Sequence, residues 1–355
     1  PCALGLAVPG VQVAAVGRLL KRGVLVKSAD ALERLAAVDT LVFDKTGTLT
    51  SGRPELQNRP QIPAEDLALA AAIAAGGRHP LARALCRTAG DVRPLEGSVT
   101  EHPGDGLQAV VDGRILRLGR RAWCGVAGDD AEGSLEAAAM ELWLSGEGQA
   151  PRRFTFRDAP RHDAARVIAH LQERGFAVEL LSGDRAAVVA DLARQLGIAT
   201  WRGDCRPGDK IARLETLAAE GRKTAMIGDG LNDAPALAAA FASLSPAEAA
   251  DVSQVAADII FQGERLLPIA EALDTARRSR RLVLQNFGLA FSYNVIAVPI
   301  AVAGMVTPLI AAVAMSASSI VVTANAMRLN LGSLKIDERR RDPAAPQACA
   351  PEAAE

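Results

Sequence analysis

Aromatic side chains, cysteine pairs and a surplus of one charge are all scarce in this sequence of 355 residues. Aromatic residues make up 3% of it, and its 5 cysteines form no CxxC pair, which argues against a disulfide framework and a structural zinc site. The 40 Lys and Arg residues nearly balance the 41 Asp and Glu residues, so we expect no nucleic-acid partner. Hydrophobic residues make up 49% of the chain, which predicts folded domains and excludes a chain that is disordered as a whole.

Charge is also missing locally. Residues 282–327 contain no Asp, Glu, Lys or Arg, in a chain where 23% of residues are charged. As a helix, this stretch is long enough to cross a hydrocarbon core of about 30 Å twice. Gly304 and Pro308 bracket the expected turn, so we predict transmembrane helices over 282–304 and 306–327. Arginines flank both ends of the stretch, which predicts that both ends face the cytoplasm.

The alternative for this stretch is a buried helical pair in a soluble protein, which is weaker because soluble helices seldom lack charge on every face. Residues 1–17 also lack charge but are too short to span a bilayer, and they predict the end of a transmembrane helix whose beginning is missing. We therefore expect the chain to be the C-terminal portion of a larger protein. Residues 335–355 end in an Ala- and Pro-rich run and predict a disordered cytoplasmic tail.

Between these segments, short apolar runs alternate with helical patterns. The runs predicted as strands are Thr40–Phe43, Ala177–Leu181, Thr224–Ile227 and Asp258–Phe261. This alternation predicts an α/β domain with a doubly wound parallel sheet over residues 18–50 and 151–265. Residues 51–150 interrupt the pattern with their own helices and strand-like pieces, which predicts an inserted α+β domain.

Polar side chains follow the predicted strands, at the edge where the carboxyl ends of parallel strands meet. Asp44 directly follows the first strand, and we expect it to be exposed at a sharp turn, where its carboxylate can attack phosphorus and form an acyl-phosphate. Such an attack needs its negative charge neutralised, commonly by Mg²⁺ and a lysine. Asp229 and Asp233 supply further carboxylates, Lys210 supplies a cation, and Ser182 supplies a hydroxyl.

These residues lie in the motifs DKTGTLT, SGD, RPGDK and GDGLNDAP, whose order resembles that of P-type ATPases, with a catalytic core of the haloacid-dehalogenase-like superfamily. The resemblance implies that ATP phosphorylates Asp44 in a phosphorylation domain, and that Lys210 neutralises the phosphoryl group. It implies that Asp44, Thr46 and Asp229 hold Mg²⁺. Ser182 stands where the family usually has Thr. The catalytic positions that it implies are Asp44, Lys45, Thr46, Ser182, Gly183, Asp184, Lys210, Asn232 and Asp233.

A membrane-anchored phosphatase of the same superfamily is the competing interpretation. Such enzymes place a second Asp two residues after the nucleophile, where it protonates the leaving group and then activates water. Here that position is Thr46, which cannot act as an acid or base at neutral pH. We therefore expect a phosphoenzyme that lasts long enough to drive a conformational cycle, which suits a pump.

The inserted domain, 51–150, resembles the nucleotide-binding domain of the heavy-metal branch of this family. His79 and Pro80 match its His-Pro dipeptide, and Glu101 with Gly104 and Gly106 matches its Glu and Gly-x-Gly signature. Glycines let the backbone approach a nucleotide, and an imidazole can contact the adenine ring. The resemblance therefore implies an ATP site in this domain.

The membrane segments carry polar and sulfur-bearing groups, which are functional candidates because unpaired polar groups are costly in hydrocarbon. Thiolate and thioether ligands select monovalent copper over hard cations such as Mg²⁺. The spacing of these residues resembles the transport site of copper-exporting P-type ATPases, which implies Cu⁺ or Ag⁺ as the transported ion. The candidate metal ligands are Cys2, Tyr293, Asn294, Met315, Ser318 and Ser319.

The stretch GRLLKRGVLVKSADALERL resembles the subgroup that supplies copper to terminal oxidases. The resemblance as a whole implies a multi-pass protein of the cell membrane with cytoplasmic catalytic domains, and a cytoplasmic copper chaperone as a partner. No TGE motif of an actuator domain occurs in the sequence, so we expect ATP binding without a complete transport cycle. A non-enzymatic membrane metal-binding protein with a vestigial ATPase core stays open as an alternative.

Overall fold

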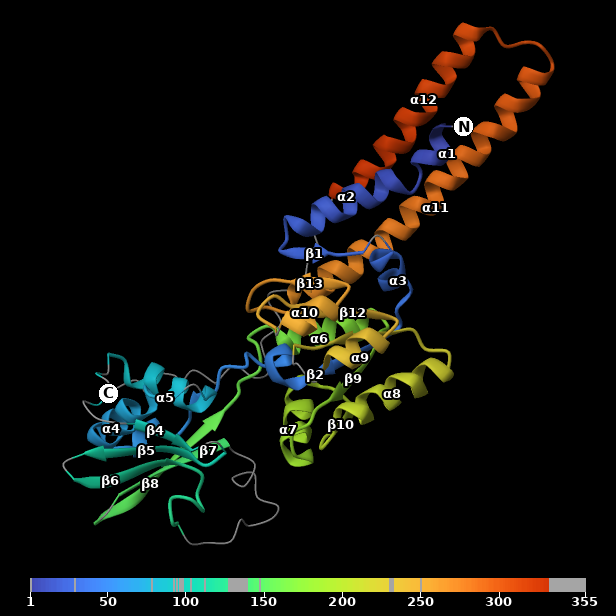
Figure 1. Ribbon diagram of the computed structural model, residues 1–355. Helices are drawn as coiled ribbons and strands as arrows, with labels where there is room; N and C mark the ends of the chain where they lie inside the picture. Colours follow the sequence, from blue (N-terminus) through green and yellow to red (C-terminus); the bar gives the residue numbers. More distant parts are fainter. Residues whose placement is uncertain are drawn as a thin grey trace, which may run out of the picture. The chain divides into compact units, whose positions relative to one another are not determined.

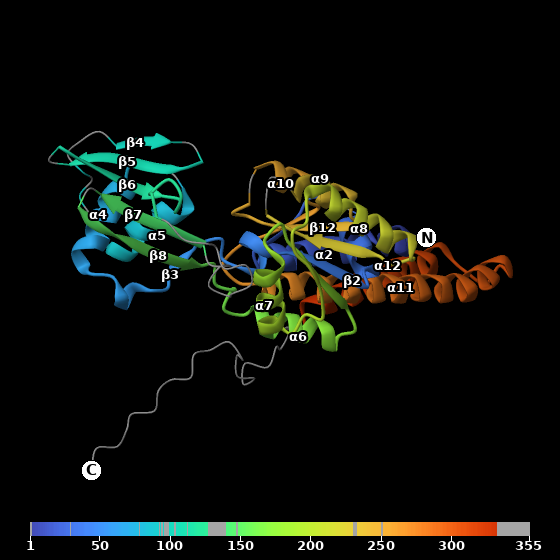
Figure 2. The same ribbon diagram turned by 90° about the horizontal axis from the view of Figure 1, so that it is seen from below.

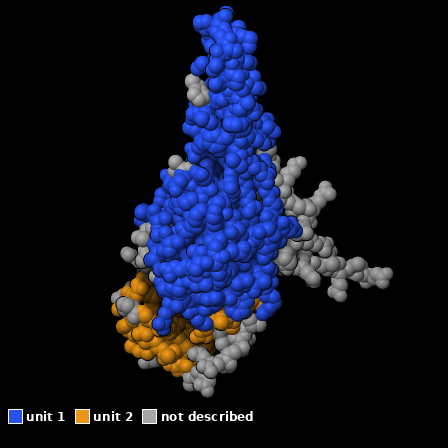
Figure 3. All heavy atoms as spheres, turned by 90° about the vertical axis from the view of Figure 1, so that its right-hand side faces the viewer, with its two compact units in different colours: residues 1–49, 161–183, 192–355 blue, residues 50–160, 184–191 orange. Residues whose placement is uncertain are grey.

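The computed structural model describes two compact units, residues 1–49, 161–183 and 192–355 in one and residues 50–160 and 184–191 in the other (Figures 1 and 3). Within these ranges the structure describes all residues except 1, 29, 78, 92, 94, 96–98, 103, 112, 127–139, 147, 230–232, 250 and 332–355. The predicted tail, 335–355, lies outside the described residues.

The first unit is built on a seven-stranded sheet in the order β1-β13-β12-β11-β2-β9-β10. All neighbouring strands are parallel except β1, which pairs antiparallel with β13 at one edge. The predicted parallel sheet is confirmed, and three of its strands, β1, β10 and β12, were not predicted. The strands are β1 (Val24–Val26), β2 (Thr40–Asp44), β9 (Ala177–Leu181), β10 (Thr200–Arg202), β11 (Thr224–Ile227), β12 (Ala242–Pro246) and β13 (Ile259–Phe261).

Helices cover both faces of this sheet, with α8 and α9 on one side and α6 and α11 on the other (Figure 2). On the first side, Leu214 of α8 and Leu237 of α9 pack against Val42 and Met226 of the strands. Because both faces are covered, β2 and β11 are buried at every position and read as continuous apolar runs. The helices of this unit are α3 (Ala31–Ala37), α6 (Ala164–Glu173), α8 (Pro207–Ala219), α9 (Ala234–Ala239), α10 (Asp251–Ala256) and α11 (Leu267–Val302), and α7 (Ala186–Leu196) is divided between the two units at residue 191.

Strand β2 lies at the point where the strand order reverses. The chain continues from β2 to β9 and β10 on one side, and returns to β11 on the other. Asp44 at the end of β2 pairs with Leu181, the last residue of β9, and Phe43 pairs with Ile227, the last residue of β11. The turns that follow these three strands therefore meet at one edge, which is where doubly wound folds bind ligands.

The second unit is a six-stranded antiparallel sheet in the order β3-β8-β7-β6-β5-β4, packed against two helices. Its core includes Phe154 and Phe156 of the sheet and Ile73 and Leu85 of the helices. This arrangement confirms the predicted α+β insertion. The elements are β3 (Glu55–Leu56), α4 (Ala64–Ala74), α5 (Pro80–Ala89), β4 (Val99–His102), β5 (Gly106–Val111), β6 (Arg114–Gly119), β7 (Met140–Gly146) and β8 (Gln149–Arg157), with a 3-10 turn at Arg59–Gln61.

Two long helices of the first unit, α11 and α12 (Pro308–Met327), are long and apolar enough to cross a membrane. They form the hairpin seen at the orange and red end of the chain in Figure 1. The turn between them contains Gly304 in a left-handed conformation, with φ of +74°. A 3-10 turn, Arg328–Asn330, follows α12. The first turns of α11, up to about Ala276, are buried in the α/β part, so one continuous helix joins the sheet to the apolar hairpin.

The opening segment differs from the single helix end that we predicted. It forms two helices, α1 (Cys2–Leu6) and α2 (Pro9–Leu20), separated at Ala7 and Val8. The cause is Pro9, which has no N–H and cannot continue the ladder of helical hydrogen bonds. Both helices pack against α11 and α12.

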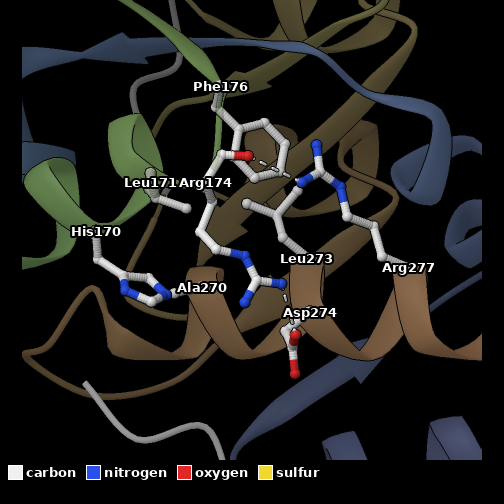
Figure 4. A pocket seen from close by; sticks show the side chains of 8 residues that line it. All are labelled: His170, Leu171, Arg174, Phe176, Ala270, Leu273, Asp274 and Arg277. Carbon is white, nitrogen blue, oxygen red and sulfur yellow. Dashed lines mark hydrogen bonds and ion pairs between the residues drawn. The ribbon is translucent and has the colours of Figure 1, made fainter.

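A small hollow of about 10 Å³ lies where α6 meets the buried base of α11 (Figure 4). The Arg174 guanidinium is 2.9 Å from the Asp274 carboxylate, and the Arg277 guanidinium stacks 3.8 Å from the centre of the Phe176 ring. The hollow holds at most one water molecule. These contacts therefore fasten α11 to the sheet and do not form a ligand site.

Candidate active site

Asp44 is 6% exposed, so the prediction of an exposed carboxylate at the end of β2 is wrong. The physical reason is that two other side chains cover it. Lys210 of α8 places its Nζ 2.6 Å from Asp44 Oδ1 and 2.5 Å from Asp233 Oδ1. The lysine thus bridges two carboxylates that the sequence separates widely. All three side chains are buried.

Burial and neighbouring charges act in opposite directions on the pKa values of Asp44 and Lys210. Burial raises the pKa of Asp44, and the charge of Asp233 raises it further, to about 6, although Lys210 acts in the opposite direction. Burial alone would lower the pKa of Lys210, but the charges of Asp44 and Asp233 outweigh it and raise that pKa. The ammonium therefore stays protonated and holds both carboxylates.

The turn after β2 gives room to a third carboxylate. Gly47 has φ of +67°, and a Cβ atom built at this position would lie 1.4 Å from Oδ2 of Asp229. Only glycine is therefore compatible with this position, because any other side chain would occupy the volume of the Asp229 carboxylate. The turns after β2 and β11 are interlocked at this contact.

Asp44, Asp229 and Asp233 each place one carboxylate oxygen within 4.8 Å of the others. Oxygen ligands of this kind suit Mg²⁺, which prefers carboxylates together with waters and substrate phosphates. The notch at Gly47 places Asp229 beside the other two carboxylates, whose remaining oxygens can bind a cation. The residues present therefore fit a Mg²⁺ ion.

The other predicted catalytic residues lie around this cluster or outside the described part. Lys45 is buried and Thr46 is exposed, both in the turn that follows Asp44. Ser182 is buried directly after β9, where its N–H donates to the Arg202 carbonyl. Gly183 follows it in the same unit, Asp184 belongs to the second unit, and Asn232 lies outside the described residues.

Sequence reasoning missed Arg161, which holds the turn after Asp44. Its buried guanidinium donates to the carbonyl oxygens of Gly47 at 2.7 Å and Gly263 at 2.8 Å, and its backbone N–H donates to the Leu49 carbonyl. Burial lowers the pKa of Arg161, while nearby carboxylates, Glu248 foremost, act in the opposite direction. The only signal in the sequence was a lone arginine just beyond the inserted domain.

Asp163, two residues further on, caps the start of α11. Its carboxylate is 1% exposed and accepts hydrogen bonds from the backbone N–H groups of Leu266, at 2.9 and 3.0 Å, and of Leu267, at 2.9 Å. A carboxylate at a helix N-terminus satisfies free N–H groups and complements the helix dipole. The segment 161–163 therefore joins the turn after Asp44 to the base of α11.

In the second unit, His79 caps α5, and its Nδ1 accepts a hydrogen bond from the Leu81 N–H. This contact puts the ring proton on Nε2, and the ring is exposed. Pro80 begins the helix. Gly76 and Gly77 precede His79, and Cβ atoms there would lie within 3 Å of Val99 in β4 and Leu107 in β5. The His-Pro turn thus packs tightly against the hairpin formed by β4 and β5.

The same hairpin carries the other predicted nucleotide-binding residues. Glu101 is exposed on β4, Gly104 lies in the turn with φ of +85°, and Gly106 begins β5. A Cβ atom at Gly106 would lie 2.3 Å from the Leu118 carbonyl oxygen, so this strand needs glycine to approach β6. The structure therefore brings the His-Pro turn and the Gly-x-Gly turn to one hairpin.

The predicted transport residues lie on α1, α11 and α12. Cys2 is in α1, and its side chain is not described. Asn294 on α11 donates to the Ala290 carbonyl, and Ser318 and Ser319 on α12 both donate to the Met315 carbonyl. These hydrogen bonds stay within single helices. Tyr293 is half-buried and Met315 is 44% exposed, so their role as metal ligands stays a prediction.

Comparison with known families decides the catalytic fold. Residues 38–240, which hold the whole cluster around Asp44, match the haloacid dehalogenase-like hydrolases. The chain belongs to this haloacid dehalogenase-like family. The buried Asp44 at the end of β2 is thus the first carboxylate of a haloacid dehalogenase-like sheet, with the second unit inserted directly after it.

Within this haloacid dehalogenase-like family, the proteins similar to this chain include copper-transporting ATPases and proteins named for nitrogen fixation. Nitrogen fixation protein FixI of Bradyrhizobium diazoefficiens is 46% identical over 95% of this chain and 46% of its own length. A probable copper-transporting ATPase, SynA, of Synechococcus elongatus is 39% identical over 92% of this chain and 43% of its own. The predicted resemblance to heavy-metal P-type ATPases is confirmed. The chain spans less than half the length of these two relatives.

A solved structure extends the similarity beyond the catalytic fold. The crystal structure of a zinc-transporting PIB-type ATPase in the E2.Pi state has a TM-score of 0.76 to this chain and is 30% identical to it. The match covers 93% of this chain and 56% of the zinc-transporting one. The similarity therefore includes both the haloacid dehalogenase-like unit and the apolar helices.

Proposed function

We propose that this chain is the catalytic and C-terminal membrane portion of an ATP-driven pump that moves Cu⁺ out of the cytoplasm through an aspartyl-phosphate. The observation that carries the proposal is the buried group in which Lys210 bridges Asp44 and Asp233, with Asp229 held against Gly47. A nucleophile, a fixed cation and further carboxylates at one sheet edge are what phosphoryl transfer to a carboxylate requires.

In the reaction, an Asp44 carboxylate oxygen attacks the γ-phosphorus of ATP. A bond forms between that oxygen and phosphorus, the bond from phosphorus to the β,γ-bridging oxygen breaks, and ADP leaves with the electron pair. Lys210, already within 2.6 Å of Asp44, offsets negative charge near the attacking oxygen, and Ser182 offers a hydroxyl to the transferred group. Asp233 holds Lys210 in place from its other side.

The residues that would hold Mg²⁺ are Asp44 and Asp229 of the carboxylate group, with Thr46 from the turn after Asp44, while Asp233 stays paired with Lys210. When bound, Mg²⁺ supplies positive charge that neutralises the phosphoryl oxygens. The phosphoryl group is then retained, because Thr46 occupies the position at which a phosphatase needs an acid or base. This retention favours a pump over a phosphatase.

The second unit would bind ATP. The support is that His79 presents its Nε2–H from an exposed ring at the start of α5, while the neighbouring hairpin carries Glu101, Gly104 and Gly106. An imidazole N–H and an exposed glycine turn suit an adenine ring and a closely approaching nucleotide.

The transported ion would bind between the apolar helices, through Cys2, Tyr293, Asn294, Met315, Ser318 and Ser319. Residues 282–327 contain no carboxylate, so the donors that these helices offer are sulfur, hydroxyl and amide groups. The thiolate and thioether among these donors favour soft Cu⁺ or Ag⁺, and the lack of a carboxylate removes one of the usual Zn²⁺ ligands, although one similar structure is a zinc transporter. A cytoplasmic copper chaperone would deliver the ion, and the protein would be a multi-pass protein of the cell membrane.

The test uses the full-length protein in lipid nanodiscs with γ-labelled ATP and Cu⁺. We expect acid-stable labelling in the parent protein and none in Asp44→Asn. Asp30→Asn is a matched control, because the Asp30 side chain is 64% exposed and pairs with Arg34 of α3, and it should label normally. Labelling of Asp44→Asn at the parent level would refute the proposal. Stimulation by Zn²⁺ and not by Cu⁺ would refute the choice of ion.

A further inference from the structure

A buried pair of asparagines joins the two long apolar helices. Asn286 on α11 is 0% exposed, and Asn325 on α12 is 9% exposed. The Asn325 Nδ2 group donates to Asn286 Oδ1 at 2.9 Å. Neither residue has a part in the phosphoryl-transfer chemistry proposed above. Polar side chains at such positions are costly unless they find partners, so a buried amide pair between two apolar helices needs a reason.

The pair also reaches the break between α1 and α2. The Asn286 Nδ2 group donates to the carbonyl oxygen of Ala7 at 3.2 Å, in a buried contact. Ala7 lies in the turn that Pro9 imposes by lacking an N–H, where the helical ladder is interrupted. Asn286 therefore gives a side-chain hydrogen bond to a carbonyl at the interruption, and ties that point to both long helices.

The other end of this chain of contacts is an arginine. Arg328 donates from Nη1 to Asn325 Oδ1 at 2.9 Å, directly after α12 ends. We call the group formed by the Ala7 carbonyl, Asn286, Asn325 and Arg328 the amide clasp. A second contact runs beside it, because Arg18 of α2 donates to the Leu329 carbonyl at 2.7 Å.

The amide clasp lies on the same faces of the helices as two predicted metal ligands. Tyr293 follows Asn286 by seven residues on α11, and Ser318 precedes Asn325 by seven residues on α12. Seven residues are two helical turns, or about 10 Å, and they return to the same face of a helix. Since α11 and α12 run in opposite directions, Tyr293 and Ser318 lie at a similar distance from the clasp, on the side away from Arg328.

We propose that Asn286 and Asn325 are positioning residues that set the spacing of the three segments that carry the transported-metal ligands. The inference rests on the proposed function, in that those ligands bind Cu⁺. The clasp fixes α1, α11 and α12 to one another two turns from the ligands, so its loss lets the ligands separate. The chemistry at Asp44 does not use the clasp, so its loss weakens metal binding and leaves phosphoryl transfer at saturating metal intact.

The test measures Cu⁺ binding to the full-length protein in nanodiscs by competition with a chromogenic Cu⁺ chelator, without ATP. The variants are Asn286→Leu, Asn325→Leu and the double variant. Each single variant should raise the dissociation constant about tenfold, in line with the loss of a buried hydrogen bond. The double variant should be no weaker than the weaker single variant, because the two amides act as one unit.

Two further variants keep the result interpretable. Thr323→Val removes a hydroxyl whose hydrogen bond stays within α12, and it should bind Cu⁺ like the parent protein. Asn286→Gln keeps an amide donor and acceptor on a longer side chain, without adding a charge. Its Cu⁺ dissociation constant should fall between those of the parent and Asn286→Leu, and it tests the clasp if the leucine variant does not fold.

The outcomes separate this inference from the proposed function. The positioning role is overturned if the single variants bind Cu⁺ as the parent does. It is also overturned if the fold-increase in the dissociation constant of the double variant equals the product of the two single fold-increases. ATP-dependent phosphorylation at saturating Cu⁺, measured on the same samples, should match the parent, and its loss in the single variants would also overturn the positioning role. A parent protein that binds Cu⁺ but is never phosphorylated would refute the proposed function. The Cu⁺ dissociation constants of the parent and the asparagine variants would still test the clasp.

Discussion

Oδ2 of Asp229 occupies the place where a Cβ atom would lie at Gly47, only 1.4 Å away. Two turns that the sequence separates by more than 180 residues are therefore interlocked, and each limits what the other can contain. The position of Asp229 beside Asp44 depends on the missing side chain at Gly47.

Replacing Gly47 by Ala should therefore abolish phosphorylation. The methyl group would displace the Asp229 carboxylate, and the φ of +67° adds a strain of about 1–2 kcal/mol for a residue with a Cβ atom. Acid-stable labelling by γ-labelled ATP in the full-length protein measures the effect. Gly221→Ala is the matched control, because Gly221 has φ of +81° and open space around it, and it should label at the parent level. Normal labelling of Gly47→Ala would show that Asp229 has room to move.

Lys210→Met should loosen the sheet around Asp44 and also stop phosphorylation. It leaves Asp44 and Asp233 buried without the cation between them, and breaking a buried ion pair in this way costs about 3–5 kcal/mol. Hydrogen exchange of the β2 amides should accelerate accordingly. Adding Asp233→Asn removes one of the two unpaired charges and should recover part of the protection, without recovering labelling. Unchanged exchange in Lys210→Met would contradict the bridging role of the lysine.

Arg161→Lys should slow phosphorylation about tenfold, which corresponds to about 1.4 kcal/mol. The guanidinium reaches two carbonyls in different segments, at Gly47 and Gly263, and a single ammonium cannot replace this fork. Single-turnover labelling at saturating ATP measures the rate. Arg222→Lys is the control. Arg222 is half-exposed, and its ion pair with Asp39 is long, at 3.9 Å, so it contributes little. A parent-like rate in Arg161→Lys would mean that the turn after Asp44 holds its shape without this contact.

His79→Ala should raise the ATP concentration needed for half-maximal labelling about tenfold and leave the maximal level unchanged. The expected cause is the loss of the Nε2–H donor to the nucleotide, together with the cap that Nδ1 provides to the Leu81 N–H. Thr88→Ala on the same helix removes a hydroxyl that donates to the Ala84 carbonyl within that helix, and it should leave the ATP dependence unchanged. If the two variants behave alike, His79 has no place in the nucleotide site.

The sequence was informative where both faces of a strand are buried. Strands β2, β9 and β11 are mostly apolar, with Glu179 as a charged exception inside β9, and each leads into a motif whose order was diagnostic, so the sheet edge and its acidic residues could be predicted. Strand β12 gave no such signal because Ser243 and Ser245 are buried in it. Ser243 is satisfied there by the Asp258 carboxylate, a contact that depends on the folded sheet.

Which residues form the site could be predicted better than how they contact one another. The burial of Asp44 follows from Lys210 and Asp233 closing over it, and local sequence does not encode that closure. Arg161 and Asp163 act on Gly47 and Leu266, more than 100 residues away in each case, so no local pattern could assign them. Such hydrogen bonds form only in the folded protein, where the sheet brings together segments that precede and follow the inserted unit.

Because α11 is unbroken from its capped base at Leu267 to Tyr293, it works as a stiff rod about 39 Å long between the sheet and the apolar hairpin. A pivot of about 5° at that base, where Asp163 accepts hydrogen bonds from Leu266 and Leu267, would move Tyr293 sideways by about 3 Å. A displacement of that size is longer than a metal–ligand bond. If Asp44 is phosphorylated and Tyr293 binds the ion, as proposed, a small rotation of α11 at its base is therefore enough to make or break a contact to the ion.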